Sequence, residues 1–220
     1  MEIIKNKQRV LICSAPVLCI TMMVLMPLAT ALIGKTAGYI LGFCLYWFAI
    51  CIPVSFYCSG GWSGLKEIYS QKSDIPIINR IAYYLLAGVS CLATLFVIFL
   101  KVAPNAGMQV LAIAFSFALI NGTIEELYWR GTFNKVFEKN IGFAYFYPSV
   151  FFGIWHIALF FAKGVVYQGG FASLVGGAFF LGVLWGWVAF KTKSIRIVTA
   201  AHILTNFFGF TGLIYENWFI

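Results

Sequence analysis

Six polar side chains of types that can catalyse hydrolysis stand inside, or at the end of, long apolar stretches of this chain. They are Glu125, Glu126, Arg130, His156, His202 and Asn206. The two histidines are the only ones among the 220 residues. An ionisable side chain at membrane depth costs about 2.5–3.5 kcal/mol on insertion scales and usually faces a partner or a water-filled cavity. One shared polar cavity would offset this cost for all of them.

The spacing of these residues suggests a chemical role for each. Arg130 follows Glu126 by one helical turn, so the two can form an ion pair, and Asn206 stands in the same relation to His202. A partly desolvated glutamate can take a proton from water near neutral pH, while an arginine keeps the neighbouring carboxylate ionised. His202 and Asn206 can donate hydrogen bonds to the oxyanion of a tetrahedral intermediate. The set suits hydrolysis of an amide bond.

Composition places this chemistry in a membrane. Apolar residues make up 62% of the chain and charged residues 10%, with a mean hydropathy of +0.92. Apolar runs occur at roughly 10–33, 36–58, 81–100, 108–129, 143–162, 171–190 and 197–215. Because lipid leaves an irregular backbone unsatisfied, we predict an all-α polytopic bundle of about seven membrane-spanning helices. A water-soluble globular protein, a disordered chain and a disulfide-rich secreted scaffold are excluded.

Basic residues alternate between the connections. Four segments hold three each: Lys5, Lys7 and Arg9; Lys66, Lys72 and Arg80; Arg130, Lys135 and Lys139; Lys191, Lys193 and Arg196. The intervening connections hold only Lys35, Lys101 and Lys163. This bias predicts a cytoplasmic N-terminus and an external C-terminus, and it explains the net charge of +8 without nucleic acid.

The same topology predicts how deep the polar groups lie. If Pro148 opens its helix, His156 lies about 12 Å below the cytoplasmic start of that helix. The polar groups then fall in the cytoplasmic half of the bilayer, so we expect a cavity open to the cytosol.

The N-terminal half carries no catalytic pattern. We expect residues 1–220 to form one membrane domain, with 1–107 as helices of unassigned role and 108–215 as the catalytic core. The first apolar run could be a cleaved signal peptide ending at Ala29-Thr30-Ala31, but about 24 residues exceed the usual 7–15, which favours a retained helix. Between Ser59 and Arg80, the mixture of apolar and charged residues predicts an amphipathic piece at the cytoplasmic surface.

The three patterns read EExxxR, FxxxH and HxxxN, and each lies on its own apolar run. They are formed by Glu125–Arg130, Phe152–His156 and His202–Asn206. In this order they resemble the family of CAAX proteases and bacteriocin-processing or self-immunity proteins (CPBP, also called Abi), which are intramembrane glutamate endopeptidases. The resemblance covers roughly residues 110–210, about half of the chain.

The resemblance implies that Glu125 activates the attacking water together with His156, and that Phe152 shapes the water pocket. It also implies the roles that spacing suggests for Glu126, Arg130, His202 and Asn206. We therefore expect a multi-pass, metal-independent endopeptidase that cuts a peptide bond near the cytoplasmic face of a cell membrane, with a bacterial plasma membrane preferred. Its partners would be the lipid bilayer and a substrate: a prenylated CAAX peptide, a bacteriocin or signalling-peptide leader, or a membrane-protein segment. Peptide maturation or immunity is the preferred role.

Several other interpretations compete with this one. A zinc site is disfavoured because HExxH is absent and Arg130 would lie close to the cation, so no cofactor is expected. A serine protease built on Gly61-Trp62-Ser63-Gly64 would leave the two glutamates unexplained, and an aspartyl protease needs more than Asp74, the one aspartate. A structural Glu126–Arg130 pair, a non-catalytic immunity or scaffolding protein and a proton-coupled carrier remain open.

Overall fold

The protein is mostly helical in residues 2–70 and 75–220, the parts of the chain that this computed structural model describes. No strand occurs in those residues, which confirms the predicted all-α class. The α-helices are α1 (Glu2–Ile33), α2 (Lys35–Cys44), α3 (Ile52–Ser59), α4 (Gly61–Ser70), α5 (Ile77–Thr94), α6 (Leu100–Glu125), α7 (Phe133–Phe137), α8 (Tyr147–Phe160), α9 (Gly177–Thr192) and α10 (Arg196–Ile214). π-Helical segments adjoin them: η1 (Leu45–Cys51), η2 (Leu95–Phe99), η3 (Glu126–Thr132), η4 (Gly142–Phe146), η5 (Ala172–Gly176) and η6 (Tyr215–Phe219).

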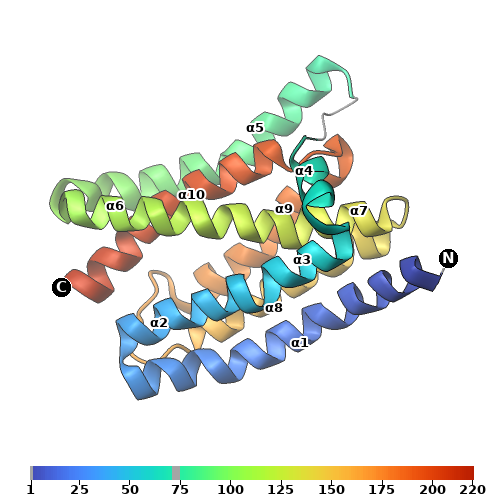
Figure 1. The fold of residues 1–220 in the computed structure, drawn as a ribbon. Helices are drawn as coiled ribbons and strands as arrows, with labels where there is room; N and C mark the ends of the chain where they lie inside the picture. The colour runs from blue at the N-terminus through green and yellow to red at the C-terminus, as the bar shows by residue number, and fades with distance from the viewer. Residues whose placement is uncertain (1, 71–74) are drawn as a thin grey trace.

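The apolar runs form long helices because few residues interrupt them. Six helices in the described residues are long and apolar enough to cross a membrane, and the longest covers 61 residues, Ile77–Phe137. That run is broken at Gly107, whose φ of 75° and ψ of 164° are not helical. Figure 1 shows the chain reversing direction between α5 and α6. The predicted runs 81–100 and 108–129 therefore lie before and after Gly107. Both belong to the segment Ile77–Phe137, which counts as one of the six helices.

The connections predicted to be basic meet at one end of the bundle. Figure 1 shows the N-terminus, α4 and α7 at this end, and the C-terminus and the α5–α6 turn at the other. We call them the basic end and the far end. Arg130 does not belong to the basic end, because it is buried in the bundle at 2% exposure. Lys72 and Asp74 lie outside the described residues, and the cytoplasmic placement of the basic end stays a prediction.

Close helix packing holds α1 against α2, and α8 against α9. A Cβ atom at Gly38 would lie 2.5 Å from backbone atoms of Ala29 and Thr30, so only glycine permits this approach. A Cβ at Gly182 would lie 2.8 Å from the carbonyl oxygen of Ser149. These contacts bring α8 and its neighbours close enough for their side chains to converge in the centre of the bundle.

The amphipathic piece predicted between Ser59 and Arg80 is α4, which packs across the basic end. Leu65 and Ile68 are buried, whereas Lys66 and Glu67 are exposed. The Tyr69 hydroxyl donates a 2.7 Å hydrogen bond to the carbonyl oxygen of Thr123 on α6. α4 therefore closes the basic end over the helix that carries the two glutamates.

Candidate active site

Three hydrogen-bond donors from η1, α6 and α8, together with the His202 imidazole of α10, surround the carboxylate of Glu125. Its Oε1 accepts hydrogen bonds from the Tyr46 hydroxyl at 2.7 Å and from Trp155 Nε1 at 2.9 Å. Its Oε2 accepts one from Asn121 Nδ2 at 3.0 Å and lies 3.3 Å from His202 Nε2. Glu125 is 1% exposed, so these donors replace the water that burial removes. The position of the carboxylate is therefore fixed from several sides.

A second set of contacts orients those donors. The Tyr46 hydroxyl accepts a 2.8 Å hydrogen bond from Trp129 Nε1, and its ring stacks on Trp155 with the centroids 4.0 Å apart. Asn121 Oδ1 accepts a 2.8 Å hydrogen bond from Trp47 Nε1, which leaves the Asn121 amide nitrogen directed at the carboxylate. Since every one of these groups is buried, the network holds Glu125 without bulk water.

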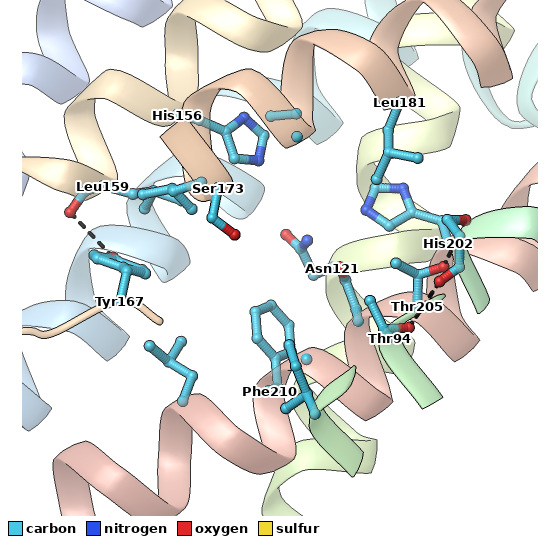
Figure 2. Close-up of a pocket in the computed structure, with 18 of the residues that line it drawn as sticks. Thr94, Asn121, His156, Leu159, Tyr167, Ser173, Leu181, His202, Thr205 and Phe210 are labelled. Carbon is cyan, nitrogen blue, oxygen red and sulfur yellow. Dashed lines mark hydrogen bonds between the residues drawn. The ribbon is translucent and has the colours of Figure 1, made fainter. Parts of the chain in front are cut away.

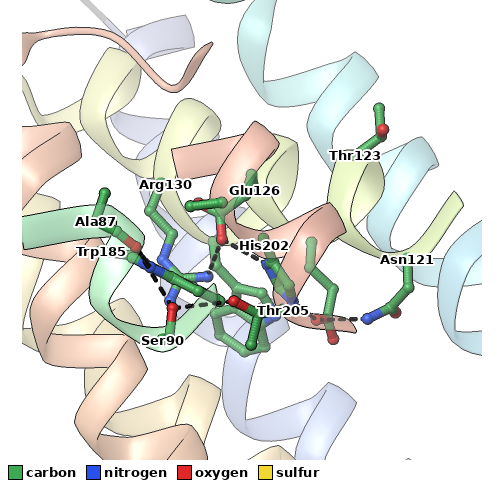
Figure 3. A network of polar contacts seen from close by, with 12 residues as sticks. Ala87, Ser90, Asn121, Thr123, Glu126, Arg130, Trp185, His202 and Thr205 are labelled. Atoms are coloured by element: carbon green, nitrogen blue, oxygen red, sulfur yellow. Dashed lines mark hydrogen bonds and ion pairs between the residues drawn. The ribbon is translucent and has the colours of Figure 1, made fainter. Parts of the chain in front are cut away.

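Glu126 points to the other side of its helix, into an ion pair. Its Oε1 accepts a 2.8 Å hydrogen bond from Arg130 Nη1, so the pair predicted from the four-residue spacing is present (Figure 3). The Arg130 guanidinium also lies 4.0 Å from the centroid of the Phe152 ring. These residues lie in or beside η3, a π-helical segment of the kind that often occurs at functional sites.

His202 lies between the two carboxylates. Its Nδ1 is 2.8 Å from Glu126 Oε1 and its Nε2 is 3.3 Å from Glu125 Oε2. When both ring nitrogens carry hydrogen, the imidazolium donates from Nδ1 to Glu126 and forms an ion pair with Glu125 through Nε2, and with Arg130 it balances the two negative charges. The Trp185 ring lies 4.5 Å from the imidazole ring and covers it. His202 therefore has no free ring nitrogen in this arrangement.

His156 has a different environment. Its Nδ1 lies 2.7 Å from the carbonyl oxygen of Phe152, one turn earlier on α8. When Nδ1 carries the hydrogen of a neutral ring, it donates to that carbonyl and Nε2 keeps a lone pair. Figure 2 shows the ring pointing into the central cavity. His156 thus presents a hydrogen-bond acceptor to whatever occupies that space.

One cavity of about 400 Å³ joins the three sequence patterns (Figure 2). The predicted site residues that line it are Glu125, Phe152, His156, His202 and Asn206. Glu126 and Arg130 do not line it; they lie behind His202 and Phe152. Most other lining residues are apolar, with small hydroxyl side chains contributed by Ser90, Thr94, Ser173 and Thr205. The arrangement can hold water and a peptide group beside a carboxylate and an imidazole.

Asn206 supplies an unused donor to this cavity. Its Nδ2 is buried and has no hydrogen-bond partner among the described residues. A buried amide without a partner is costly and calls for an occupant. Asn206 is therefore free to serve an oxyanion as predicted, whereas His202 must first leave Glu125 to do so.

Glu125 and His156 lie farther from the basic ends of their helices than the sequence predicts. The helix that carries Glu125 continues through η3 and α7 to Phe137, so this carboxylate lies roughly 18 Å from the basic end of its helix. The estimate of about 12 Å for His156 is too short, because η4 extends the helix from Pro148 back to Gly142 and roughly doubles the distance. Glu125 thus lies well inside its helix, whereas His156 lies four residues before the end of α8 and His202 six residues after the start of α10.

The cavity also extends in an unexpected direction. Its lining continues past the site to Tyr167 and Gln168 in the connection between α8 and α9, and to Leu213 near the end of α10, all toward the far end. At the basic end, α4 packs against η3 through Ile68. The expected opening toward the basic end is therefore not found, because α4 and the Glu126–Arg130 pair close that side.

Several residues that support Glu125 were not predicted from the sequence. Asn121 could have been noticed, since it precedes Glu125 by one helical turn and is polar within an apolar run. Tyr46, Trp129 and Trp155 gave no signal, because aromatic residues in apolar runs usually only pack. Trp155 does adjoin His156, but neighbours on a helix point in different directions.

The structure also places the residues of the zinc and serine-protease sites that were considered as alternatives. Among residues 2–70 and 75–220, no group of three or more His, Cys, Asp or Glu side chains has an arrangement that could hold a metal ion. Ser63 is exposed on α4, donates to the carbonyl oxygen of Gly60 and does not line the cavity. Ser63 therefore does not share the cavity that His156 and His202 line.

A family comparison agrees with this geometry. Residues 107–208 match the family model described as type II CAAX prenyl endopeptidase Rce1-like. Neither a curated protein nor a solved structure matches the chain. The matched segment starts at the Gly107 turn and contains all three patterns, but it stops short of half of the chain and leaves out Tyr46. We conclude that this multi-pass membrane protein carries, at residues 107–208, a domain of the Rce1-like CAAX endopeptidase family.

Proposed function

We propose that this membrane endopeptidase hydrolyses a peptide bond with a water molecule activated between Glu125 and His156. The observation that carries the proposal is the single cavity of about 400 Å³ that Glu125, His156, His202 and Asn206 line together, although they come from three helices. Random placement of four polar residues in a membrane bundle would not bring them to one space. The matched family supports peptide-bond hydrolysis as the reaction.

The geometry suggests how the roles are divided. Three hydrogen bonds and an ion-pair contact with His202 hold the Glu125 carboxylate, and that contact, 3.3 Å from His202 Nε2, is the longest and the one that a water molecule can replace most easily. The water oxygen then bonds to the peptide carbonyl carbon, and its proton passes to the Glu125–His156 pair. From there the proton reaches the leaving nitrogen as the C–N bond breaks.

The same displacement frees His202 for the oxyanion. Once His202 Nε2 leaves Glu125, it can donate to the developing oxyanion beside Asn206 Nδ2, which already lacks a partner. Glu126 and Arg130 stay behind the cavity, where Glu126 holds His202 Nδ1 at 2.8 Å. In this proposal Glu126 and Arg130 position His202 and do not touch the substrate.

The proposed mechanism uses no metal. Arg130 lies in an ion pair with Glu126, and a guanidinium at that distance would repel a cation bound by the same carboxylates. A chelator should leave the activity of the purified protein unchanged. Activity that is lost with chelator and restored by zinc would overturn this part of the proposal.

The physiological role that we propose is peptide maturation or bacteriocin processing and immunity in a bacterial plasma membrane. The candidate substrates are a peptide leader and a membrane-protein segment. The family description favours a second candidate, a prenylated CAAX peptide, and the largely apolar cavity fits either kind of substrate. The alternative to both enzymatic roles is a non-catalytic immunity or scaffolding protein, and the experiment below distinguishes it from them.

The deciding experiment compares the proteomes of cells that carry the wild type or Glu125→Gln, with new peptide ends as the readout. Loss of a positioned general base should lower cleavage by about 10²–10⁴-fold. Glu67→Gln is the matched control, since this exposed carboxylate on α4 pairs with Lys135 outside the cavity.

Peptide ends that vanish with Glu125→Gln but persist with Glu67→Gln would support the proposal. Both variants should be checked for membrane insertion and melting temperature, so that a folding defect is recognised. If Glu125→Gln folds and the proteome is unchanged while protection against a bacteriocin persists, the catalytic proposal is wrong. A farnesylated CAAX peptide offered to the purified protein separates the prenyl substrate from the others.

A further inference from the structure

A second cavity, of about 300 Å³, lies at the basic end and shares no residue with the active site. Its α1 wall consists of Lys5, Gln8, Arg9 and Ile12. The opposite wall comes from the end of α7 and the connection to α8, including Phe137 and Asn140. The cavity therefore joins the first helix of the chain to the Rce1-like domain.

Two cations line this cavity without a counter-ion. Lys5 and Arg9 are one helical turn apart, so both side chains lie on one face of α1. Within the described residues, neither has a carboxylate within 4.0 Å; the nearby acidic candidates, Glu2 and Glu138, are exposed and form no ion pair. An anion between Lys5 and Arg9 would relieve their repulsion.

The cavity is built of fixed parts as well as mobile side chains. Gln8 Nε2 donates a 3.4 Å hydrogen bond to the carbonyl oxygen of Val136, which ties α1 to α7. Asn140 Oδ1 accepts a 3.2 Å hydrogen bond from the backbone nitrogen of Phe143, so its amide NH₂ remains available as a donor. A lysine, an arginine and an amide can thus donate to one group of oxygens.

The floor of the cavity is apolar and continues along the membrane-spanning helices. Ile12 and Phe143 both line it, and the Tyr147 hydroxyl donates a 2.6 Å hydrogen bond to the carbonyl oxygen of Ile12, so α1 and α8 lie side by side from this point. Farther along, both helices expose apolar side chains, among them Ile20 at 66% and Val150 at 44%. A ligand with an anionic head and apolar chains fits this combination.

We propose that this cavity binds the phosphate headgroup of an anionic phospholipid at the basic end of the bundle. Basic pockets between membrane helices on the cytoplasmic side are suited to such headgroups, and each nearby Lys or Arg strengthens the attraction. Free phosphate offers the same oxygens, but it would not use the apolar surface that continues from Ile12. A lipid bound here fastens α1 to the α7–α8 connection and leaves the catalytic cavity untouched.

Native mass spectrometry of the purified full-length protein, titrated with phosphatidylglycerol or phosphatidylcholine, tests the proposal. The wild type should bind phosphatidylglycerol more tightly than phosphatidylcholine, and Lys5→Gln/Arg9→Gln should weaken phosphatidylglycerol binding by at least about tenfold. The exchange Lys5→Arg/Arg9→Lys keeps both charges and should retain most of the binding. The matched control is Lys66→Gln/Lys191→Gln, which removes two exposed charges elsewhere at the basic end.

Each other outcome would overturn the proposal. If the control pair weakens binding as much as Lys5→Gln/Arg9→Gln, the lipid responds to overall charge and no site exists. If inorganic phosphate at millimolar concentration displaces phosphatidylglycerol completely, the ligand is free phosphate and the lipid assignment is wrong. Melting temperatures of all variants, measured alongside, distinguish weaker binding from misfolding.

Discussion

The matched segment 107–208 and the helices before it contribute differently to one site. Every candidate reacting group, and the whole Glu126–Arg130–His202 cluster, comes from the matched segment. The earlier helices contribute supports, the Tyr46 hydroxyl on Glu125 and Trp47 Nε1 on Asn121, together with part of the cavity lining. The charge cluster is thus self-contained within the matched segment, whereas the carboxylate that faces the cavity depends on both parts of the chain. Substitutions on each side of this division should therefore have different consequences.

The largest effect on stability should come from the self-contained cluster. Arg130→Gln removes the cation from a pair that is 3% and 0% exposed and leaves Glu126 buried without full compensation. Breaking such a pair costs about 3–5 kcal/mol. Lys135→Gln removes a cation from the exposed pair with Glu67 and should cost less than about 1 kcal/mol. Unfolding titrations in mixed micelles measure both changes, and equal losses would contradict a buried charge cluster.

A smaller effect, on activity, should follow from removing the Tyr46 hydroxyl, which supports Glu125 from outside the matched segment. Tyr46→Phe removes one of the donors to Glu125 and the acceptor of the Trp129 Nε1 hydrogen. One hydrogen bond of this kind corresponds to about a tenfold change in cleavage rate. Tyr128→Phe is the matched control, since that buried hydroxyl contacts Ser14 and lies outside the cavity.

The rate of Tyr46→Phe should fall while that of Tyr128→Phe stays within about twofold of the wild type. Turnover of a processed peptide found by proteomics provides the assay. Equal rates for the two variants would mean that the helices before residue 107 only pack around the site.

The smallest effect should come from Tyr69, which joins the two parts at the basic end. Tyr69→Phe removes the 2.7 Å hydrogen bond to the Thr123 carbonyl oxygen and should cost about 1 kcal/mol of stability at pH 7. Burial and the neighbouring Glu126 charge raise the pKa of Tyr69. A raised pKa stabilises the fold below the ordinary tyrosine pKa of about 10, and this contribution fades as the pH rises above it. The difference between Tyr69→Phe and the wild type should therefore narrow above pH 10, as unfolding titrations at several pH values would show.

The sequence was informative where a rule of spacing links residue types to geometry. Glu126 and Arg130 are four residues apart and form the expected pair, and Phe152 and His156, with the same spacing, both line the cavity. The cost of burying polar groups in lipid also predicted that Glu125, His156 and His202 would converge. Their roles in catalysis remain predictions.

The sequence could not give the depth or the surroundings of the site. A helix continues as long as its residues pack against the rest of the protein. Phe133 and Phe137 of α7 are buried, so the helix of Glu125 continues past the polar residues Asn134 and Lys135. Contacts between distant segments, such as Tyr46 with Glu125 across 79 positions, have no local signal. The amphipathic pattern predicted α4 as a surface helix. Its packing against η3, which closes the basic end of the cavity, is a contact between distant segments and had no local signal either.

The most direct test of the central claim is a double-substitution cycle on Glu125 and His156, with kcat for a processed peptide as the readout. If both residues act on one water molecule, Glu125→Gln and His156→Gln should each lower kcat by about 10²–10⁴-fold, and the double variant should be no slower than the slower single one. Losses that multiply in the double variant would show that the two side chains act independently, and the proposed Glu125–His156 mechanism would be wrong.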